Sequence, residues 1–445
     1  MVGKRRSGLF VHRKAYSWAK VTPSIPPIPP VTYTVTYNGN TKTSGNVPTD
    51  GSSPYTAGSS VTILANSGTL AKTGYTFAGW NSAANGSGTS YSEGDTFTIN
   101  ANTILYARWT LNAPFAPTAL SSVAGNQAAY ILFTQSGTVT NYQYSTDDGA
   151  TYLAFDPPQI YSPVEINTLS SDPDRTIRLT NGIQYTVKLK AVNSGGPSNE
   201  SASVTVTPTV TSLTSTGRII YLDANNSSSY SGSGTTWTNL DSAGSYSATL
   251  VGSPPFNTTD ANNKYFDFNR AAATGQFAQI TENDVINPVV NQPFTIQMWV
   301  RINNVGSQGN LFNKMFIGTK DYDGYNLMYR TDDKLRLHLN GSSRDNEFYS
   351  VTGVLSSGWR LYTANIQFGN GGGRTNKLFV NSRQVMTATS TEGSIPNNDQ
   401  NITFPAGFGG DGECDVGQFY YYNTELTTTQ IIQNYDATKP RYIAS

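Results

Sequence analysis

The chain has 445 residues, enough for about three domains of ordinary size. Charged residues make up only 13% of it, and no stretch of 18 apolar residues occurs, which excludes a membrane-spanning helix. The formal net charge is zero, and the single cysteine, Cys414, excludes internal disulfides and cysteine-rich zinc sites.

Residues 1–20 form a basic arm. Residues 1–31 contain six Lys or Arg and no acid, which leaves 23 basic against 29 acidic residues in the rest of the chain. The apolar run at residues 9–11 is too short for a secretory signal, which needs about 7–15 such residues. We expect the arm to be an anchoring peptide that orders on a partner's acidic surface, in preference to binding nucleic acid. Its basic residues are Lys4, Arg5, Arg6, Arg13, Lys14 and Lys20.

Residues 21–31, VTPSIPPIPPV, contain five prolines. Proline fixes φ near the polyproline II value, so this segment is expected to be a semi-rigid spacer. A ligand for a partner's aromatic groove is the alternative interpretation.

Residues 32–110 are expected to form the first domain, because segments such as YTVTYNGN and NTILYARWT alternate between apolar and polar residues as strands do. Trp80 and Trp109 are the expected core anchors of this small domain. With GYTFAGWNSAANGSGTSY and GDTFTINANTILYARW, the segment resembles the Listeria–Bacteroides repeat of internalin-type surface proteins. The resemblance implies a β-grasp-like spacer and interaction module without catalytic residues.

Residues 111–209 are expected to form a second β domain. Its last segment, LTNGIQYTVKLKAVNSGGPSNESASVTVTPT, resembles the end of a fibronectin type III domain. The resemblance implies a sandwich that serves as a rigid spacer, with Tyr185 as the tyrosine corner. The early core tryptophan of that family is missing, and Tyr130 or Phe133 is the expected substitute.

Residues 210–445 contain many short strands separated by turns, which favours a two-sheet jelly roll. The segments PFTIQMWVRI, NKLFVNSRQV and DVGQFYYYNTELTTTQIIQNY resemble the laminin G-like, concanavalin-like superfamily. The last of them matches that family's closing strand and short helix. The fold class is thus all-β and multidomain: a β-grasp-like repeat, a fibronectin type III-like sandwich and a concanavalin-like jelly roll.

The sequence does not favour an enzyme. The histidines are His12 in the arm and His338 in an alternating strand, and neither belongs to a catalytic constellation. Asp411, Glu413 and Asp415 alternate, but they lack the flanking pattern of glycosidases with this fold. No cofactor is expected. Calcium is the open alternative, with these three acids as candidate ligands.

Glycan binding requires aromatic platforms with polar neighbours. The candidates in the third domain are Tyr322, Tyr325, Trp359 and Arg374. Strand alternation directs half of such rings into the core, so the sequence leaves open which of them are free.

These features lead to the hypothesis of a viral structural protein, most simply a bacteriophage capsid-decorating or head/tail fibre protein on the virion surface. Its arm would bind other virion proteins (capsid, portal or tail), and residues 210–445 would bind host-surface glycans, with homo-oligomerisation left open. The hypothesis rests on three surface-type modules without an export signal, membrane span or sorting tail. The alternatives are a bacterial cell-surface adhesin, which would be extracellular, and a polysaccharide-active enzyme with accessory modules.

Overall fold

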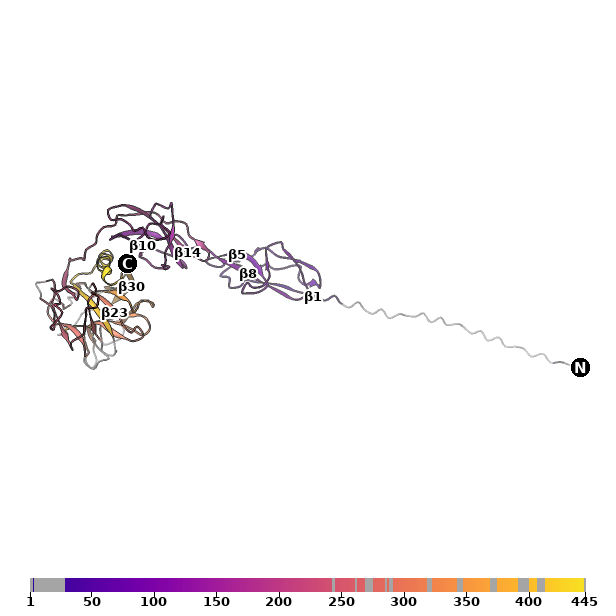
Figure 1. The fold of residues 1–445 in the computed structure, drawn as a ribbon. Coiled ribbons are helices and arrows are strands. Elements are labelled where there is room, and N and C mark those ends of the chain that lie inside the picture. Colours follow the sequence, from indigo (N-terminus) through magenta and orange to yellow (C-terminus); the bar gives the residue numbers. More distant parts are fainter. Residues whose placement is uncertain are drawn as a thin grey trace. The chain divides into compact units, whose positions relative to one another are not determined.

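A computed structural model describes residue 3 and residues 29–241, 245–260, 262–268, 275–284, 286–287, 291–317, 322–341, 347–368, 374–390, 400–405 and 413–443. The fold is all-β and multidomain, as predicted, and its described helices are few and short (Figure 1). The chain divides into two compact units, residues 1–112 (unit 1) and residues 113–445 (unit 2). The arm residues Lys4, Arg5, Arg6, Arg13, Lys14 and Lys20 lie outside the described residues.

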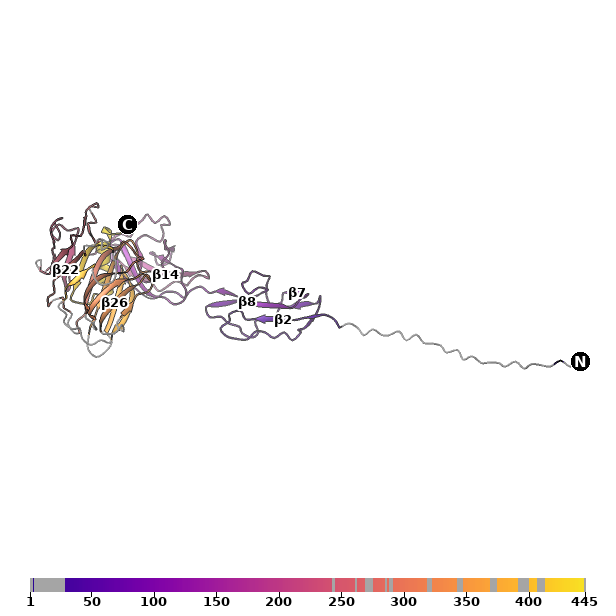
Figure 2. The same ribbon diagram turned by 90° about the horizontal axis from the view of Figure 1, so that it is seen from below.

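Unit 1 is built around the sheet β2-β8-β5-β6, in which β2 runs parallel to β8 (Figure 2). Trp80 is fully buried in its core, and the Trp109 indole nitrogen donates to the Asn40 carbonyl at 2.8 Å. Both tryptophans therefore anchor this domain. Its strands are β1 (Thr32–Tyr33), β2 (Val35–Asn38), β3 (Tyr55–Thr56), β4 (Ser60–Thr62), β5 (Tyr75–Asn81), β6 (Ser90–Tyr91), β7 (Thr96–Thr98) and β8 (Thr103–Leu111).

Unit 2 begins with two facing sheets, β13-β10-β9 and β12-β11-β14-β15 with β16 beside β14; residues 113–209 are called the sandwich below. In β14, buried and partly exposed residues alternate, as the period of two predicts. The Thr180 backbone N–H donates to the Tyr185 hydroxyl at 3.0 Å. The strands are β9 (Thr118–Gly125), β10 (Ala128–Thr134), β11 (Asn141–Ser145), β12 (Leu153–Ala154), β13 (Val164–Ile166), β14 (Tyr185–Asn193), β15 (Gly196–Pro197) and β16 (Val204–Val206).

Residues 210–445, the jelly roll, stack two larger sheets over one apolar core. The inner sheet contains β17 (Arg218–Asp223), β20 (Phe256–Asn257), β21 (Tyr265–Phe268), β23 (Phe294–Ile302), β28 (Trp359–Ile366), β29 (Arg374–Val380), β30 (Arg383–Ser390) and β32 (Cys414–Tyr422). The outer sheet contains β18 (Thr236–Trp237), β19 (Ala248–Val251), β22 (Phe277–Ile280), β24 (Gly309–Ile317), β25 (Tyr322–Tyr329), β26 (Leu335–Gly341), β27 (Glu347–Tyr349) and β31 (Ile402–Phe404).

The inner sheet is covered on both faces. One face packs on the outer sheet, and the other lies under α1 (Thr428–Thr438) and the 3₁₀ turn η3 (Lys439–Arg441). Thr427 caps α1 together with Gln430 in a reciprocal capping box. Because both faces are covered, every residue of β32 is buried.

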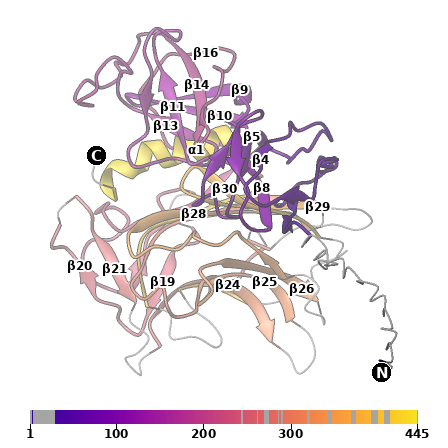
Figure 3. The ribbon, with the colours of Figure 1, turned by 90° about the vertical axis from the view of Figure 1, so that its right-hand side faces the viewer.

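Helix α1 lies between the inner sheet and the sandwich (Figure 3). One apolar cluster joins Val123 and Tyr130 of the sandwich to Trp299 of β23 and to Ile432 and Tyr435 of α1. The second and third domains therefore do not fold as separate beads. Their junction, called the joint below, is a shared hydrophobic core.

Candidate functional site

Two of the four residues predicted to bind glycan are core residues. Tyr325 has no exposed surface and packs against Phe294 and Phe312 between the two sheets. Trp359 is 6% exposed and packs against Tyr442 at 4.9 Å beneath the C-terminal segment. Neither ring can serve as a sugar platform, so these two predictions are corrected.

The other two predicted residues lie at strand ends. Tyr322 begins β25, and its side chain is outside the described residues. Arg374 begins β29, and its guanidinium donates to the Asn291 side-chain oxygen at 2.6 Å. Arg374 and Trp359 lie at opposite ends of the paired strands β28 and β29, so the structure does not bring them together.

The acidic cluster predicted to bind calcium is only partly described. Asp411 lies outside the described residues, and Glu413 immediately precedes β32. Asp415 is buried, with one oxygen paired to the Arg301 guanidinium at 2.5 Å and the other accepting from Asn303 at 3.3 Å. Burial raises the pKa of Asp415, and Arg301 opposes that shift. Both oxygens of Asp415 are already bonded within the protein, which corrects its assignment as a calcium ligand.

The joint contains a buried polar centre, the Asp436 carboxylate of α1. It accepts from the Asn126 backbone N–H at 2.7 Å, the Tyr130 hydroxyl at 2.7 Å and the Thr211 hydroxyl at 2.6 Å. Lys439 lies 3.2 Å from the same carboxylate. A charged acceptor buried among several donors fixes the helix against the sandwich, because each donor would lose its partner if the surfaces separated.

Gly125 permits this close approach. A Cβ atom at Gly125 would lie 2.7 Å from the Tyr130 ring and 2.9 Å from an Asp436 oxygen. The end of β9 therefore needs a residue without a side chain at this position.

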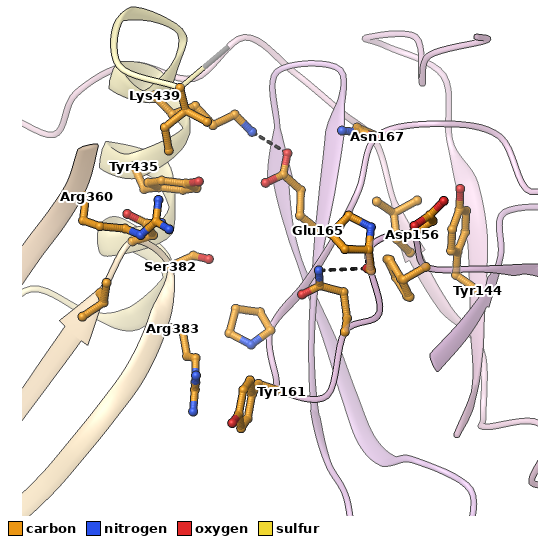
Figure 4. Close-up of a pocket in the computed structure, with 18 of the residues that line it drawn as sticks. Tyr144, Asp156, Tyr161, Glu165, Asn167, Arg360, Ser382, Arg383, Tyr435 and Lys439 are labelled. Atoms are coloured by element: carbon orange, nitrogen blue, oxygen red, sulfur yellow. Dashed lines mark hydrogen bonds and ion pairs between the residues drawn. The ribbon is translucent and has the colours of Figure 1, made fainter. Parts of the chain in front are cut away.

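Beside the joint lies a cleft with a volume of about 830 Å³, whose walls come from both the sandwich and the jelly roll. Figure 4 shows Glu165 and Tyr161 on the sandwich side, facing Lys439, Arg360 and Arg383 on the jelly-roll side. Lys439 pairs with Glu165 at 2.5 Å and so links the two walls. We refer to this space as the cleft.

The side chains of the cleft are arranged by local contacts. The centre of the Arg383 guanidinium lies 3.2 Å from the centroid of the Tyr161 ring, a cation–π contact between the two modules. Burial lowers the pKa of Arg383, but an arginine remains charged at neutral pH. Arg360 donates to the Trp359 carbonyl at 3.1 Å and lies beside the Tyr435 ring (Figure 4).

Basic residues exceed acidic ones in the cleft. Within the described residues, Arg178 and Arg360 form no ion pair, whereas Lys439 is paired with Glu165 and Asp436. The basic residues are Arg175, Arg178, Arg360, Arg383 and Lys439, and the acidic ones are Asp156 and Glu165.

Sequence patterns alone did not identify the cleft. Its walls come from three segments far apart in the chain, around residues 144–178, 353–385 and 435–443. Strand alternation assigns residues to faces within one sheet, but it does not indicate which modules meet. The nearest sequence signal was the segment NKLFVNSRQV, which contains Ser382 and Arg383 of the cleft wall.

Two family models match parts of the chain. Residues 33–108 match the Listeria-Bacteroides repeat domain, and residues 272–432 match the Concanavalin A-like lectin/glucanases superfamily. Both matches agree with the resemblances seen in the sequence. The described helices are all too short or too polar to span a bilayer.

The chain is also similar to a protein of Evansella cellulosilytica that carries the name Gly-rich membrane protein. It is 51% identical over 45 residues, which are 10% of this chain and 5% of that protein. The similarity is thus confined to a short segment.

Among solved structures, the chain is similar to the binding domain of botulinum neurotoxin serotype D/C, with 13% identity and a TM-score of 0.39. It is also similar to the binding domain of Paraclostridial Mosquitocidal Protein 1, with 15% identity and a TM-score of 0.38. The matches cover 50% and 49% of this chain and 52% of each of those chains. The chain thus spans about half the length of these structures.

Proposed function

We propose that this protein is a non-enzymatic, surface-located adhesion protein that binds glycans of a host surface through unit 2. The cleft is the observation that carries the proposal. Its volume of about 830 Å³ lies within the usual range for ligand sites, about 300–1,000 Å³. Aromatic, apolar and hydrogen-bonding side chains line it together, which is the composition that a sugar requires.

The match of residues 272–432 to a superfamily of lectins and glucanases supports the binding half of that description. A glucanase needs two carboxyl groups facing one substrate at about 5–10 Å. Asp415 is engaged by Arg301 and Asn303, which argues against its use as a catalytic acid or base. We therefore propose a lectin-like role in preference to hydrolysis.

A glycan array tests the proposal. The full chain is applied to it in two formats, as a monomer and displayed in many copies on beads. Single-site binding is expected to be weak, because association must offset lost translational and rotational freedom. Display in many copies is expected to convert weak contacts into stable adsorption. A parallel array with a chelator tests for calcium. Failure to bind any glycan in the multivalent format would contradict the proposal.

We further propose that the protein is attached to a virion, as a bacteriophage capsid-decorating or fibre protein, with the arm as its anchor. The asymmetry of charge supports this: six basic residues and no acid in residues 1–31, against an excess of acid in the remainder. A segment of this kind binds an acidic protein surface well. The alternative is attachment to a bacterial cell surface.

Deletion of residues 1–20 tests the anchor. The truncated protein is expected to keep the thermal unfolding profile of the full chain and to be lost from purified particles. Substitution of the six basic residues by Gln, with the length kept, separates charge from length. Recovery of the full chain in cell envelopes and its absence from particles would favour the cell-surface alternative.

We infer that residues 111–209 are a fibronectin type III-like sandwich. The hydrogen bond from Thr180 to the Tyr185 hydroxyl supports this, since it ties a strand to the preceding loop as a tyrosine corner does. Substitution of Tyr185 by Phe removes that bond alone. It is expected to destabilise unit 2 by about 1 kcal/mol, and an unchanged unfolding free energy would contradict this role for the hydroxyl.

A further inference from the structure

We propose that the cleft selects anionic saccharides and holds their acid groups between Arg360 of the jelly roll and Arg178 of the sandwich. This inference rests on the proposed glycan-binding function and names the ligand class of the same site. The shared chemistry is a sugar that carries a carboxylate or a phosphate.

The first argument is the charge of the lining. Five basic and two acidic side chains line the cleft, an excess of three positive charges, although the chain as a whole is neutral. Lys439 is neutralised by Glu165 and Asp436, so the excess resides on the arginines. A partly enclosed space strengthens the attraction between opposite charges, because less water screens them there than at an open surface.

The second argument is the state of each arginine. Arg175 donates to the Ala154 carbonyl at 2.5 Å, and Arg383 is held against Tyr161. Arg360 is bonded only to the neighbouring Trp359 carbonyl, and neither Arg360 nor Arg178 has an ion-pair partner among the described residues. Their guanidinium groups therefore retain donors for a ligand.

The third argument is geometry. A guanidinium presents two parallel N–H groups, which match the two oxygens of a carboxylate or phosphate. Arg360 is half-buried beside Tyr435, so it loses little freedom when a ligand binds. Ser382 and Asn167 also line the cleft and offer hydrogen bonds to sugar hydroxyls.

The test uses the full chain and four probes in two matched pairs. The carboxylate pair is an oligogalacturonate and its neutral methyl ester. The phosphate pair is a phosphorylated oligomannose and the same oligomannose without phosphate. We expect one or both acidic members to bind, the neutral members to bind at least tenfold more weakly, and the affinity to fall as salt is raised. The pair that responds identifies the source of the acid group.

The variants are Arg360→Gln and Arg178→Gln, with Arg330→Gln as the matched control. Arg330 lies outside the cleft and pairs with Asp332 at 3.2 Å, so its substitution removes the same charge from another place. We expect each cleft variant to weaken acidic binding about tenfold or more, and the control to leave it unchanged. Arg178 is exposed, so its variant remains informative if Arg360→Gln lowers the unfolding temperature.

Equal binding of acidic and neutral probes, or unchanged acidic binding in both cleft variants, would overturn the inference and leave the proposed glycan binding in place. Failure of every saccharide to bind, in any multivalent format, would overturn the proposed function as well.

Discussion

Asp436 is the residue on which the two modules of unit 2 depend most directly. Asp436 is 2% exposed, and its carboxylate accepts from Asn126 and Tyr130 of the sandwich and from Thr211 just after it. Replacement by Asn keeps the shape of the side chain but removes its charge. The new amide NH₂ group is a donor, so it cannot accept the hydrogen bonds that the Tyr130 and Thr211 hydroxyls donate. We expect Asp436→Asn to lower the free energy of unfolding by about 3 kcal/mol, because buried donors are left unpaired.

Chemical denaturation of the full chain measures that change. The matched control is Asp174→Asn, an exposed carboxylate of the sandwich, which is expected to shift stability by less than about 0.5 kcal/mol. Equal effects of the two substitutions would show that the buried carboxylate does not secure the joint.

His338 gives unit 2 a pH dependence of defined sign. It is 5% exposed in β26, and burial, followed by the nearby Arg336, lowers its pKa below the usual 6.5, while Glu347 opposes the shift. The unfolded chain therefore takes up the proton first, and stability falls as pH decreases from about 6.5 through the lowered pKa. Well above pH 6.5, where both states are deprotonated, His338 contributes no pH dependence.

Unfolding titrations of the wild type and of His338→Gln between pH 5 and 7.5 test this. The variant is expected to lose the decrease in stability that the wild type shows as pH falls through about 6.5. Parallel curves for the two proteins would contradict the assignment.

At the scale of elements, sequence patterns predicted more than they did for single side chains. The resemblance of residues 415–435 to a closing strand and short helix agrees with β32 and α1. The sequence does not predict which face of the inner sheet each tyrosine ring of β32 occupies. All nine residues of β32 are buried, so an alternation of apolar and polar residues is not present to distinguish the two faces. Similarly, the sequence around Trp359 is compatible with a sugar platform, but its ring is covered by α1 and the residues that follow the helix.

Trp359 should therefore behave as a core residue. We expect Trp359→Ala to destabilise unit 2 by about 3–5 kcal/mol, the usual cost of a cavity of that size. Tyr349→Ala, at a ring that is 42% exposed, is the comparison and should cost much less. Glycan binding by folded Trp359→Phe is expected to equal that of the wild type. Reduced glycan binding without reduced stability would instead indicate that Trp359 contacts the glycan.

The N-terminus of α1 offers a smaller test at the same scale. Thr427 accepts from the Gln430 backbone N–H at 3.2 Å, and the Gln430 side chain accepts from the Thr427 backbone N–H at 2.9 Å. We expect Thr427→Ala to cost about 1 kcal/mol of stability in denaturation of the full chain. Thr427→Asp restores a capping oxygen and should recover most of the lost stability. Equal stability of the wild type and both variants would show that the cap does not stabilise the protein.

For the molecule as a whole, the shared core predicts how the chain melts. We expect two calorimetric transitions, one for unit 1 and one for the sandwich and jelly roll together, since α1 and the Tyr130 region belong to one cluster. Asp436→Asn should lower only the transition of unit 2. Separate melting of the sandwich and the jelly roll would contradict a common core.

The number of modules and their strand-rich nature could be inferred from composition and turns, because those features are local. The joint could not be inferred. Asn126 and Asp436 are 310 residues apart in the chain, and no repeat or period relates them. The position of the cleft followed from the joint and was beyond sequence patterns for the same reason.

The joint also determines how tension would pass through unit 2. A pull that enters at residue 113 and is resisted by a ligand in the cleft loads α1, the buried rings around Trp299 and the Lys439–Glu165 pair in parallel. The connecting backbone near residue 210 would then carry only part of the load. Under shear, the sandwich and the jelly roll would yield as one block, and the cleft walls would keep their spacing until that block fails.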